Sequence, residues 1–172
     1  NDEIAVAARA FNQMADWMQQ SEAKLRAQAA QQAAAARLGF AALEGTSLDA
    51  LLDQAVQVLR EILDVEYCTV LELLPGDDEL VLRAGCGWRR GAVGSLKVPV
   101  SYGSQAGYAL LSRQPVIVND LSQETRFQAP LLAKMGIVSG MSVIIQGEHR
   151  PYGVLGVHAA TLRSFTADDL HF

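Results

Sequence analysis

Large apolar residues recur at every seventh position along the first part of the chain, and further apolar residues stand at the intermediate three-residue offset. These positions are Ile4, Ala7, Phe11, Met14, Met18 and Leu25. A stripe with this period is typical of the seam along which two helices of a coiled coil pack. Residues 1 to about 38 also contain no proline or glycine and are rich in residues that favour helices. The pattern therefore predicts one long helix.

A lone helix with such a seam leaves apolar side chains in water, so we expect it to pair with a second copy of the chain. The six seam residues then form the interface of a homodimer. The seam weakens after Leu25, where alanines replace the larger residues and offer little apolar area. The alternative is an alanine-rich helix that lies on its own domain.

A second amphipathic segment follows Gly39 and Gly45, which are expected to interrupt the first helix. Residues 46–49 have the pattern of a capping box, which predicts the start of a new helix. Beyond them, apolar residues recur at three- and four-residue spacings, as on one face of a helix. They are Leu48, Leu51, Leu52, Ala55, Leu59, Ile62 and Leu63. We expect this face to pack against an apolar surface.

The rest of the chain alternates short runs of strand-forming residues with glycine and proline turns. Residues 67–74 and 79–84 flank a turn at 75–78 and predict a β-hairpin. Further strands are predicted at 96–100, 115–118, 138–146 and 152–159, with helical turns at 104–112 and 130–134. Because strands and helices do not alternate strictly, the order predicts an α+β fold with a mainly antiparallel central sheet.

Charge and composition exclude several classes of protein. The 172 residues carry 14 basic and 19 acidic side chains, with no cluster of Lys and Arg beyond the pair Arg89 and Arg90. Nucleic-acid binding is therefore disfavoured. No apolar segment approaches the roughly 20 residues that span a bilayer, so we expect no direct membrane contact. The length fits one globular domain with an appendage.

Two cysteines and three histidines limit the chemistry. Cys68 and Cys86 lack the spacing of a zinc site and cannot form a disulfide framework, which suits a reducing cytoplasm. His149, His158 and His171 are not spaced as metal ligands either. We expect no metal site and no catalytic residue, and the sequence does not identify a cofactor. Because the chain starts and stops in mid-pattern, we interpret it as a piece of a longer protein.

Three stretches of the second half resemble a GAF domain: GMSVIIQGEHRPYGVLGVHA at 140–159, QPVIVNDLSQETRF at 114–127 and RSFTADDLHF at 163–172. The resemblance covers about residues 46–172. It implies a central antiparallel sheet with helices on one face and loops that enclose a pocket on the other. GAF domains are small-molecule-sensing and dimer-forming modules of signalling proteins, so the resemblance implies a sensor domain over residues 46–172.

The opening stretch DEIAVAARAFNQMADWMQQSE, residues 2–22, resembles the closing helix of a HAMP linker that continues into a signalling helix. HAMP units carry conformational signals from a membrane segment into cytoplasmic domains. The resemblance therefore implies a HAMP-end signalling helix over residues 1–45. It also implies a cytoplasmic position for this part of a parent protein that could be anchored in the inner membrane.

Candidate ligand-binding residues lie in the stretch that forms the pocket in GAF domains. They are Cys86, Trp88, Tyr108, Asp120, Phe127, Met141 and His158. Each has an ordinary structural alternative: a buried strand-end thiol, core side chains, a turn cap at Asp120, or a strand-end histidine. The chain lacks the Cys-His pair of bilin-binding relatives, and Asn119 is followed by Asp120 where cyclic-nucleotide-binding relatives have lysine.

The leading hypothesis is a homodimeric sensor module that relays ligand or upstream signals through its coiled coil to an output domain further along the same chain. The resemblance suggests a histidine kinase or a diguanylate cyclase as that output, within a two-component or similar system. Two alternatives stay open. One is a GAF-fold free methionine sulfoxide reductase that uses Cys86, and the other is a dimerisation relay with no ligand.

Overall fold

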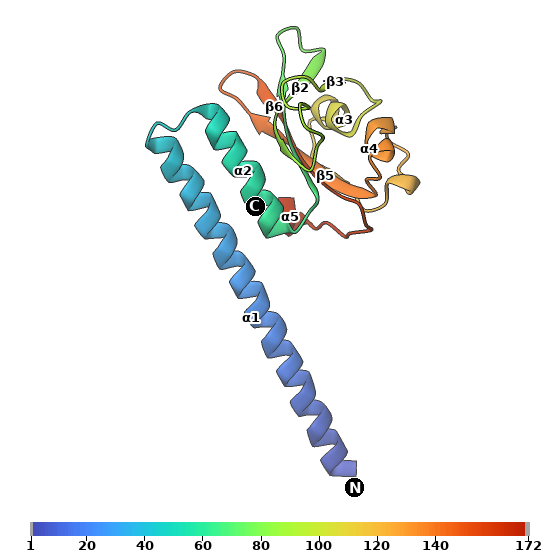
Figure 1. Ribbon diagram of the computed structural model, residues 1–172. Helices are drawn as coiled ribbons and strands as arrows, with labels where there is room; N and C mark the ends of the chain where they lie inside the picture. Colours follow the sequence, from blue (N-terminus) through green and yellow to red (C-terminus); the bar gives the residue numbers. More distant parts are fainter. Residues whose placement is uncertain (1, 171–172) are drawn as a thin grey trace.

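The computed structural model describes residues 2–170, and it combines a long N-terminal helix with an α+β domain (Figure 1). The helices are α1 Asp2–Leu43, α2 Leu48–Leu63, α3 Gln105–Ser112, α4 Pro130–Lys134 and α5 Ala167–Leu170, with a 3-10 turn η1 at Leu121–Gln123. The strands are β1 Tyr67–Leu73, β2 Glu79–Cys86, β3 Lys97–Pro99, β4 Val116–Val118, β5 Ser139–Gln146 and β6 Pro151–Ala159. The predicted α+β class and each predicted strand are confirmed.

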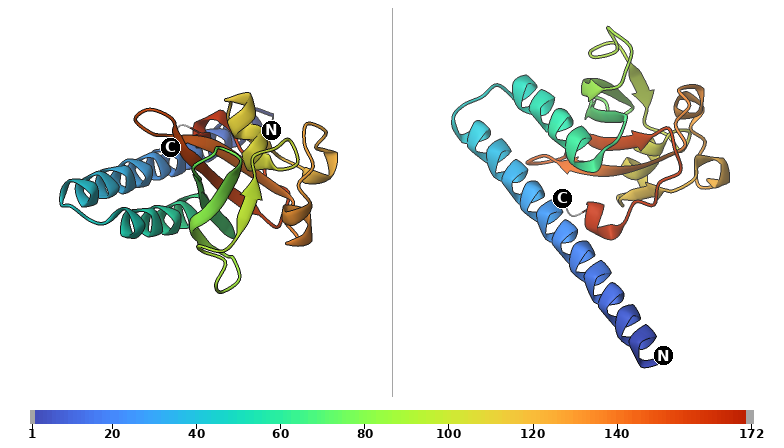
Figure 2. Two further views of the ribbon diagram at one scale, coloured as in Figure 1. Left: turned by 90° about the horizontal axis from the view of Figure 1, so that it is seen from above. Right: turned by 60° about the horizontal axis from the view of Figure 1, so that its bottom comes forward.

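Helix α1 is longer than the sequence pattern predicts. It continues through Gly39 and ends at Leu43, so the expected interruption at Gly39 is wrong. The chain leaves the helix around Gly45, whose φ of +79° lies in the left-handed region that glycine adopts readily. The second half of α1 runs antiparallel beside α2, while its first half projects away from the domain (Figures 1 and 2).

Six strands form one sheet in the order β3-β2-β1-β6-β5-β4, and every neighbouring pair is antiparallel. The hairpins β1–β2 and β5–β6 contribute the four longest strands, which occupy the middle of the sheet. Along β1, Cys68 stands opposite Cys86 on β2, and Thr69 stands opposite Gly156 on β6. Because successive side chains point to opposite faces, these two residues of β1 face different layers of the molecule.

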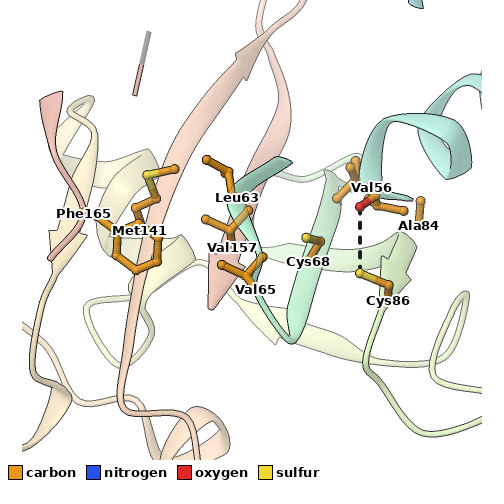
Figure 3. Close-up of a cluster of buried hydrophobic side chains, with 10 residues drawn as sticks. Val56, Leu63, Val65, Cys68, Ala84, Cys86, Met141, Val157 and Phe165 are labelled. Atoms are coloured by element: carbon orange, nitrogen blue, oxygen red, sulfur yellow. Dashed lines mark hydrogen bonds between the residues drawn. The ribbon is translucent and has the colours of Figure 1, made fainter. Parts of the chain in front are cut away.

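Helix α2 covers one face of the sheet. Its N-cap is Ser47, whose hydroxyl accepts a hydrogen bond from the Ala50 amide at 3.4 Å, so the helix begins one residue later than a cap at Thr46 would require. Its deepest residues are Val56 and Leu63, and Val56 was not among the expected apolar positions. They pack with alternate residues of the central strands, including Val70. Figure 3 shows Cys68, Cys86 and Val157 of the same cluster.

The opposite face carries a separate apolar cluster that includes Leu71, Leu82 and Val154, packed against Ala106 of α3. Helices α3 and α4 and the segment between β2 and β3 lie on this side, away from α2 (Figure 1). The domain thus has a helical layer on one face and short helices with loops on the other. Between residues 2 and 170, no helix combines the length and the apolar character that crossing a membrane requires.

Candidate ligand-binding cavity

A cavity of about 310 Å³ lies on the side of the sheet that α2 does not cover. Strands β1, β5 and β6 contribute Thr69, Ser142 and His158 to its lining, while α3 and α4 contribute residues from their first turns. Apolar side chains such as Trp88 complete the wall. This volume is at the lower end of the range for small-molecule sites, which is about 300–1,000 Å³.

Two glycines make room for the imidazole of His158 on the cavity side. Gly140 stands opposite His158 on β5, and Gly156 precedes it by two residues on β6. A Cβ at Gly140 would lie 2.5 Å from His158 Nδ1, and a Cβ at Gly156 would lie 2.6 Å from Thr69 Oγ1 and 3.0 Å from His158 Nε2. A side chain at position 140 would displace the imidazole, and one at position 156 would displace the Thr69 hydroxyl and crowd the imidazole. Both glycines are therefore required for this arrangement.

The imidazole is almost completely buried, with 4% of its residue surface exposed. Its Nδ1 atom has no hydrogen-bond partner within the described part of the chain. Burial lowers the pKa of His158 to about 4, because a low-dielectric surrounding disfavours the charged form. At neutral pH, His158 is therefore an uncharged ring with one donor and one acceptor nitrogen.

Gln105 enters the cavity lining from the first turn of α3. The helix is capped by Ser104, whose hydroxyl accepts a hydrogen bond from the Gly107 amide at 3.0 Å. Gln105 is 3% exposed, and its Nε2 has no hydrogen-bond partner among residues 2–170. Within the same range, the buried polar residues are Thr69, Gln105, Ser139, Ser142 and His158, and all except Ser139 line the cavity. Buried polar groups are thus concentrated at one site.

The model of the GAF domain family matches residues 47–172, which is more than half of the chain. The chain belongs to the GAF domain family. No curated protein sequence matches it.

Three solved structures illustrate how far the likeness extends. The GAF domain of an Acinetobacter phosphoenolpyruvate-protein phosphotransferase is 19% identical, with a TM-score of 0.70 over 82% of this chain and 84% of that one. Residues 122 to 287 of a methyl-accepting chemotaxis protein are 20% identical, with a TM-score of 0.61 over 73% and 80%. The free methionine-R-sulfoxide reductase of Neisseria meningitidis is 22% identical, with a TM-score of 0.59 over 72% and 69%. At these identities the likeness establishes the fold.

Two of the seven candidate residues, Trp88 and His158, line the cavity of this GAF domain. The indole Nε1 of Trp88 donates a hydrogen bond to the backbone oxygen of Cys68 at 3.0 Å. Its ring also meets Tyr67 edge to face, with 5.7 Å between the ring centroids. The indole is therefore held in place by the sheet, and it can present a fixed apolar surface to a bound molecule.

Cys86 and Met141 do not line this cavity, because strand alternation turns both to the face that α2 covers. There Cys86 lies against Val56 of α2, and Met141 lies beside Phe165 (Figure 3). The Cys86 sulfur lies 3.8 Å from the backbone oxygen of Val56. Burial raises the pKa of its cross-strand neighbour Cys68, and the proximity of Cys86 raises it further. Both thiols are thus held in an apolar core, and the raised pKa of Cys68 disfavours its reactive thiolate.

Tyr108, Phe127 and Asp120 also lie outside the cavity lining. Tyr108 and Phe127 belong to a small cluster in which their ring centroids are 5.4 Å apart and the Arg126 guanidinium lies within 6 Å of both. Asp120 caps η1, accepting hydrogen bonds from the amide and the hydroxyl of Ser122 at 2.9 and 2.7 Å. Asp120 thus has the contacts of a turn cap, and Tyr108 and Phe127 pack with one another.

Sequence reasoning missed Thr69, Gln105 and Ser142. A polar residue inside an apolar strand is a usable sign for Thr69, because its neighbours on β1 are Cys68 and Val70. Gln105 offers no comparable sign, since glutamine after a helix cap is usually exposed. Among residues 2–170, no three His, Cys, Asp or Glu side chains come together as a metal site. His149 is exposed in the β5–β6 turn, and His171 lies outside the described residues.

Proposed function

We propose that this GAF domain is a regulatory sensor of a signal-transduction protein and that a small molecule binds in the cavity. The observation that carries the proposal is the pair of buried groups without hydrogen-bond partners at the cavity, Gln105 Nε2 and His158 Nδ1. Each buried unsatisfied group of this kind costs about 1–3 kcal/mol. A ligand that pairs with either of them would recover part of this free energy on binding.

A second part of the proposal is a homodimer formed through α1. In the single chain the larger seam residues are exposed, including Ile4 at 77% and Phe11 at 66%. Trp17 is exposed next to this seam, which widens the apolar stripe on the projecting half of α1. An exposed apolar stripe of this length favours association, and a second copy of the same seam is the partner that its seven-residue period suits.

The relay would run from the cavity through the sheet to the helices. Thr69 faces the cavity, while its neighbours Cys68 and Val70 pack in the layer of α2. Helix α2 in turn packs along α1, where Ala34 is buried. A ligand that prefers one of two helix arrangements at the dimer interface would shift their populations by its difference in affinity.

In the intact protein, α1 would receive upstream signals through the HAMP-end stretch, and a histidine kinase or diguanylate cyclase would follow as the output domain. This part of the protein would then work in the cytoplasm, below an anchor in the inner membrane. The resemblance of residues 2–22 to a HAMP helix and the exposed seam support this arrangement.

Light scattering coupled to size-exclusion chromatography tests the dimer. We expect the wild-type chain to elute with twice the monomer mass, and Phe11→Glu to elute as a monomer because a buried unpaired charge opposes pairing. Gln13→Glu is the matched control, since Gln13 is exposed outside the seam and should leave the dimer intact. A wild-type monomer at high concentration, or an unaffected Phe11→Glu dimer, would contradict this part of the proposal.

A thermal-shift screen of metabolites tests the sensor. A ligand at a hundred times its dissociation constant stabilises the native state by about 2.7 kcal/mol. Ala106→Phe should abolish the shift because Ala106 lines the cavity, while Ala133→Phe on the exposed side of α4 should preserve it. A thermal shift that persists in Ala106→Phe would show that the ligand binds at another site.

The two alternatives receive less support. A sulfoxide reductase that uses Cys86 needs an accessible thiolate, whereas this sulfur is buried on the α2 side of the sheet. A relay without ligand would have a collapsed pocket. The cavity of about 310 Å³ and its four buried polar residues argue against such a collapse.

A further inference from the structure

The walls of the cavity are apolar over most of their extent. Leu71, Leu96, Val98 and Val154 line it together with Trp88. These side chains favour a ligand whose body is apolar, because burial of apolar surface is the main favourable contribution that such walls can make.

Charge is scarce around this cavity. Of its lining residues, Lys97 is the one with a charged side chain, and its ammonium group is already paired with Glu79 at 2.7 Å. About half of the Lys97 side chain is exposed, so the ion pair lies toward solvent. His158 is uncharged at neutral pH because burial lowers its pKa to about 4. A carboxylate or phosphate inside the cavity would therefore lose its hydration without gaining a free cationic partner.

Hydrogen-bonding groups approach the cavity from two sides. From α3, the Gln105 amide brings a donor that has no partner in the described chain. From the sheet come Thr69 and Ser142, which stand on either side of Gly156 in one row across β1, β6 and β5. The Thr69 hydroxyl uses its proton in a long hydrogen bond of 3.4 Å to the Gly156 oxygen, so its lone pairs remain available as acceptors.

We propose that this cavity takes an uncharged, mainly apolar small molecule whose carbonyl or ring-nitrogen acceptor pairs with the Gln105 side-chain amide. This inference rests on the proposed sensor function and narrows the class of its ligand. A second polar group on the ligand would meet the hydroxyls of Thr69 and Ser142 on the sheet. The arrangement selects against anionic molecules of the same shape, because no unpaired cationic side chain lines the cavity.

Matched amide and carboxylate probes test the charge preference directly. The pairs nicotinamide and nicotinate, benzamide and benzoate, and indole-3-acetamide and indole-3-acetate share a shape and differ in charge at neutral pH. Titration followed by ¹⁵N-¹H NMR reports binding at the side-chain amide of Gln105, whose resonances are assigned from their loss in Gln105→Leu. We expect at least one amide to shift these resonances and to bind about tenfold or more tightly than its carboxylate.

Variants separate the hydrogen bond from general packing. Gln105→Leu keeps the size of the side chain and should weaken amide binding by about 3- to 10-fold, measured by calorimetry. Gln57→Leu is the matched control on the exposed surface of α2 and should leave the affinity unchanged. Equal affinity in wild type and Gln105→Leu would overturn the assigned hydrogen bond.

The outcomes distinguish this inference from the proposed function. If carboxylates bind at the Gln105 amide as tightly as their amides or more tightly, the sensor function stands and the assignment of an uncharged ligand fails. If no probe of either series shifts resonances of cavity residues at millimolar concentration, the result counts against the ligand-binding function itself and removes this inference with it.

Discussion

The two faces of the central sheet are built from neighbouring residues, yet they differ in kind. On the α2 face, Cys68, Val70 and Val157 belong to a closed apolar cluster. On the other face, their sequence neighbours Thr69 and His158 line a cavity. Of the buried polar residues between positions 2 and 170, all but Ser139 belong to this cavity, and the Ser139 hydroxyl donates to the Thr161 oxygen at 2.7 Å.

This difference separates a face that stabilises the fold from the face that carries the proposed binding site. The α2 face stabilises the fold through dense apolar contacts, and the partly buried Tyr152, whose hydroxyl is unpaired, packs beside its cluster. On the cavity face, the two almost completely buried residues Gln105 and His158 each leave a nitrogen unpaired within the described part of the chain. Such groups reduce the free energy of unfolding and are therefore a sign of a site that serves another purpose. Substitutions at matched positions on the two faces should behave differently.

The largest contrast is expected from truncating one leucine on each face. Leu63→Ala should lower the free energy of unfolding by about 3 kcal/mol, because Leu63 is enclosed by the α2-face cluster. Leu132→Ala should cost less than half as much, since Leu132 already borders the cavity and has fewer partner atoms to lose. Urea denaturation measures both, and equal losses would remove the distinction between a packed and an open face.

Acid should expose the cost of burying His158. Its pKa is lowered from 6.5 to about 4 in the native state, so the unfolded chain binds the additional proton between these values. The free energy of unfolding should therefore fall as pH decreases from about 6.5 to 4, by up to about 3 kcal/mol from this residue. His158→Gln should lack this contribution. Urea denaturation of wild type and His158→Gln across this pH range measures the effect. If the free energy of unfolding changed with pH in the same way in both proteins, the buried neutral imidazole would be contradicted.

Valine and threonine have the same side-chain shape, so exchanging one for the other at adjacent positions of β1 compares the two faces of the sheet. Val70→Thr places a hydroxyl in the apolar α2 face and should lower the free energy of unfolding by about 2 kcal/mol. Thr69→Val removes only the hydrogen bond of 3.4 Å to the Gly156 oxygen and should cost less than about 1 kcal/mol. Chemical denaturation of the two variants is decisive, and similar losses would refute the assignment of faces.

Thiol labelling gives the smallest and most local test. A cysteine introduced by Ser142→Cys lines the cavity and should react with methyl methanethiosulfonate about tenfold faster than native Cys68, which is completely buried in the α2-face cluster. The raised pKa of Cys68 slows its reaction further. Peptide mass spectrometry follows the three sites in one protein. Faster labelling of Cys86 than of the introduced cysteine would instead indicate access from the α2 side.

Much of the fold could be predicted because its elements depend on local patterns. The hairpin around residues 75–78 follows from apolar runs that flank a proline and glycine turn, and β1 and β2 appear where these runs occur. Gly39 shows the limit of the same reasoning. It does not end α1, because packing of this helix along α2 outweighs the roughly 1 kcal/mol that a glycine costs inside a helix.

The site was less predictable, and the seven candidates show why. Local patterns identified the strands that carry Cys86, Met141 and His158, but not which face of each strand would be covered by α2. A shift of one residue in register exchanges the two faces, so this choice depends on the pairing of distant strands. Gln105 became a cavity residue only because α3 packs its first turn over the sheet.

Local sequence was therefore sufficient for the positions of the strands, for the two main helices apart from the C-terminal end of α1, and for the seven-residue apolar period of α1. Each of these rests on the spacing of nearby residues. The cavity required contacts between segments that are far apart in the chain. Strand register set Thr69, Ser142 and His158 on one surface, and the glycines opposite and beside the imidazole left space for it. Long-range packing then enclosed this surface with Gln105 and Trp88 and withdrew its polar groups from water.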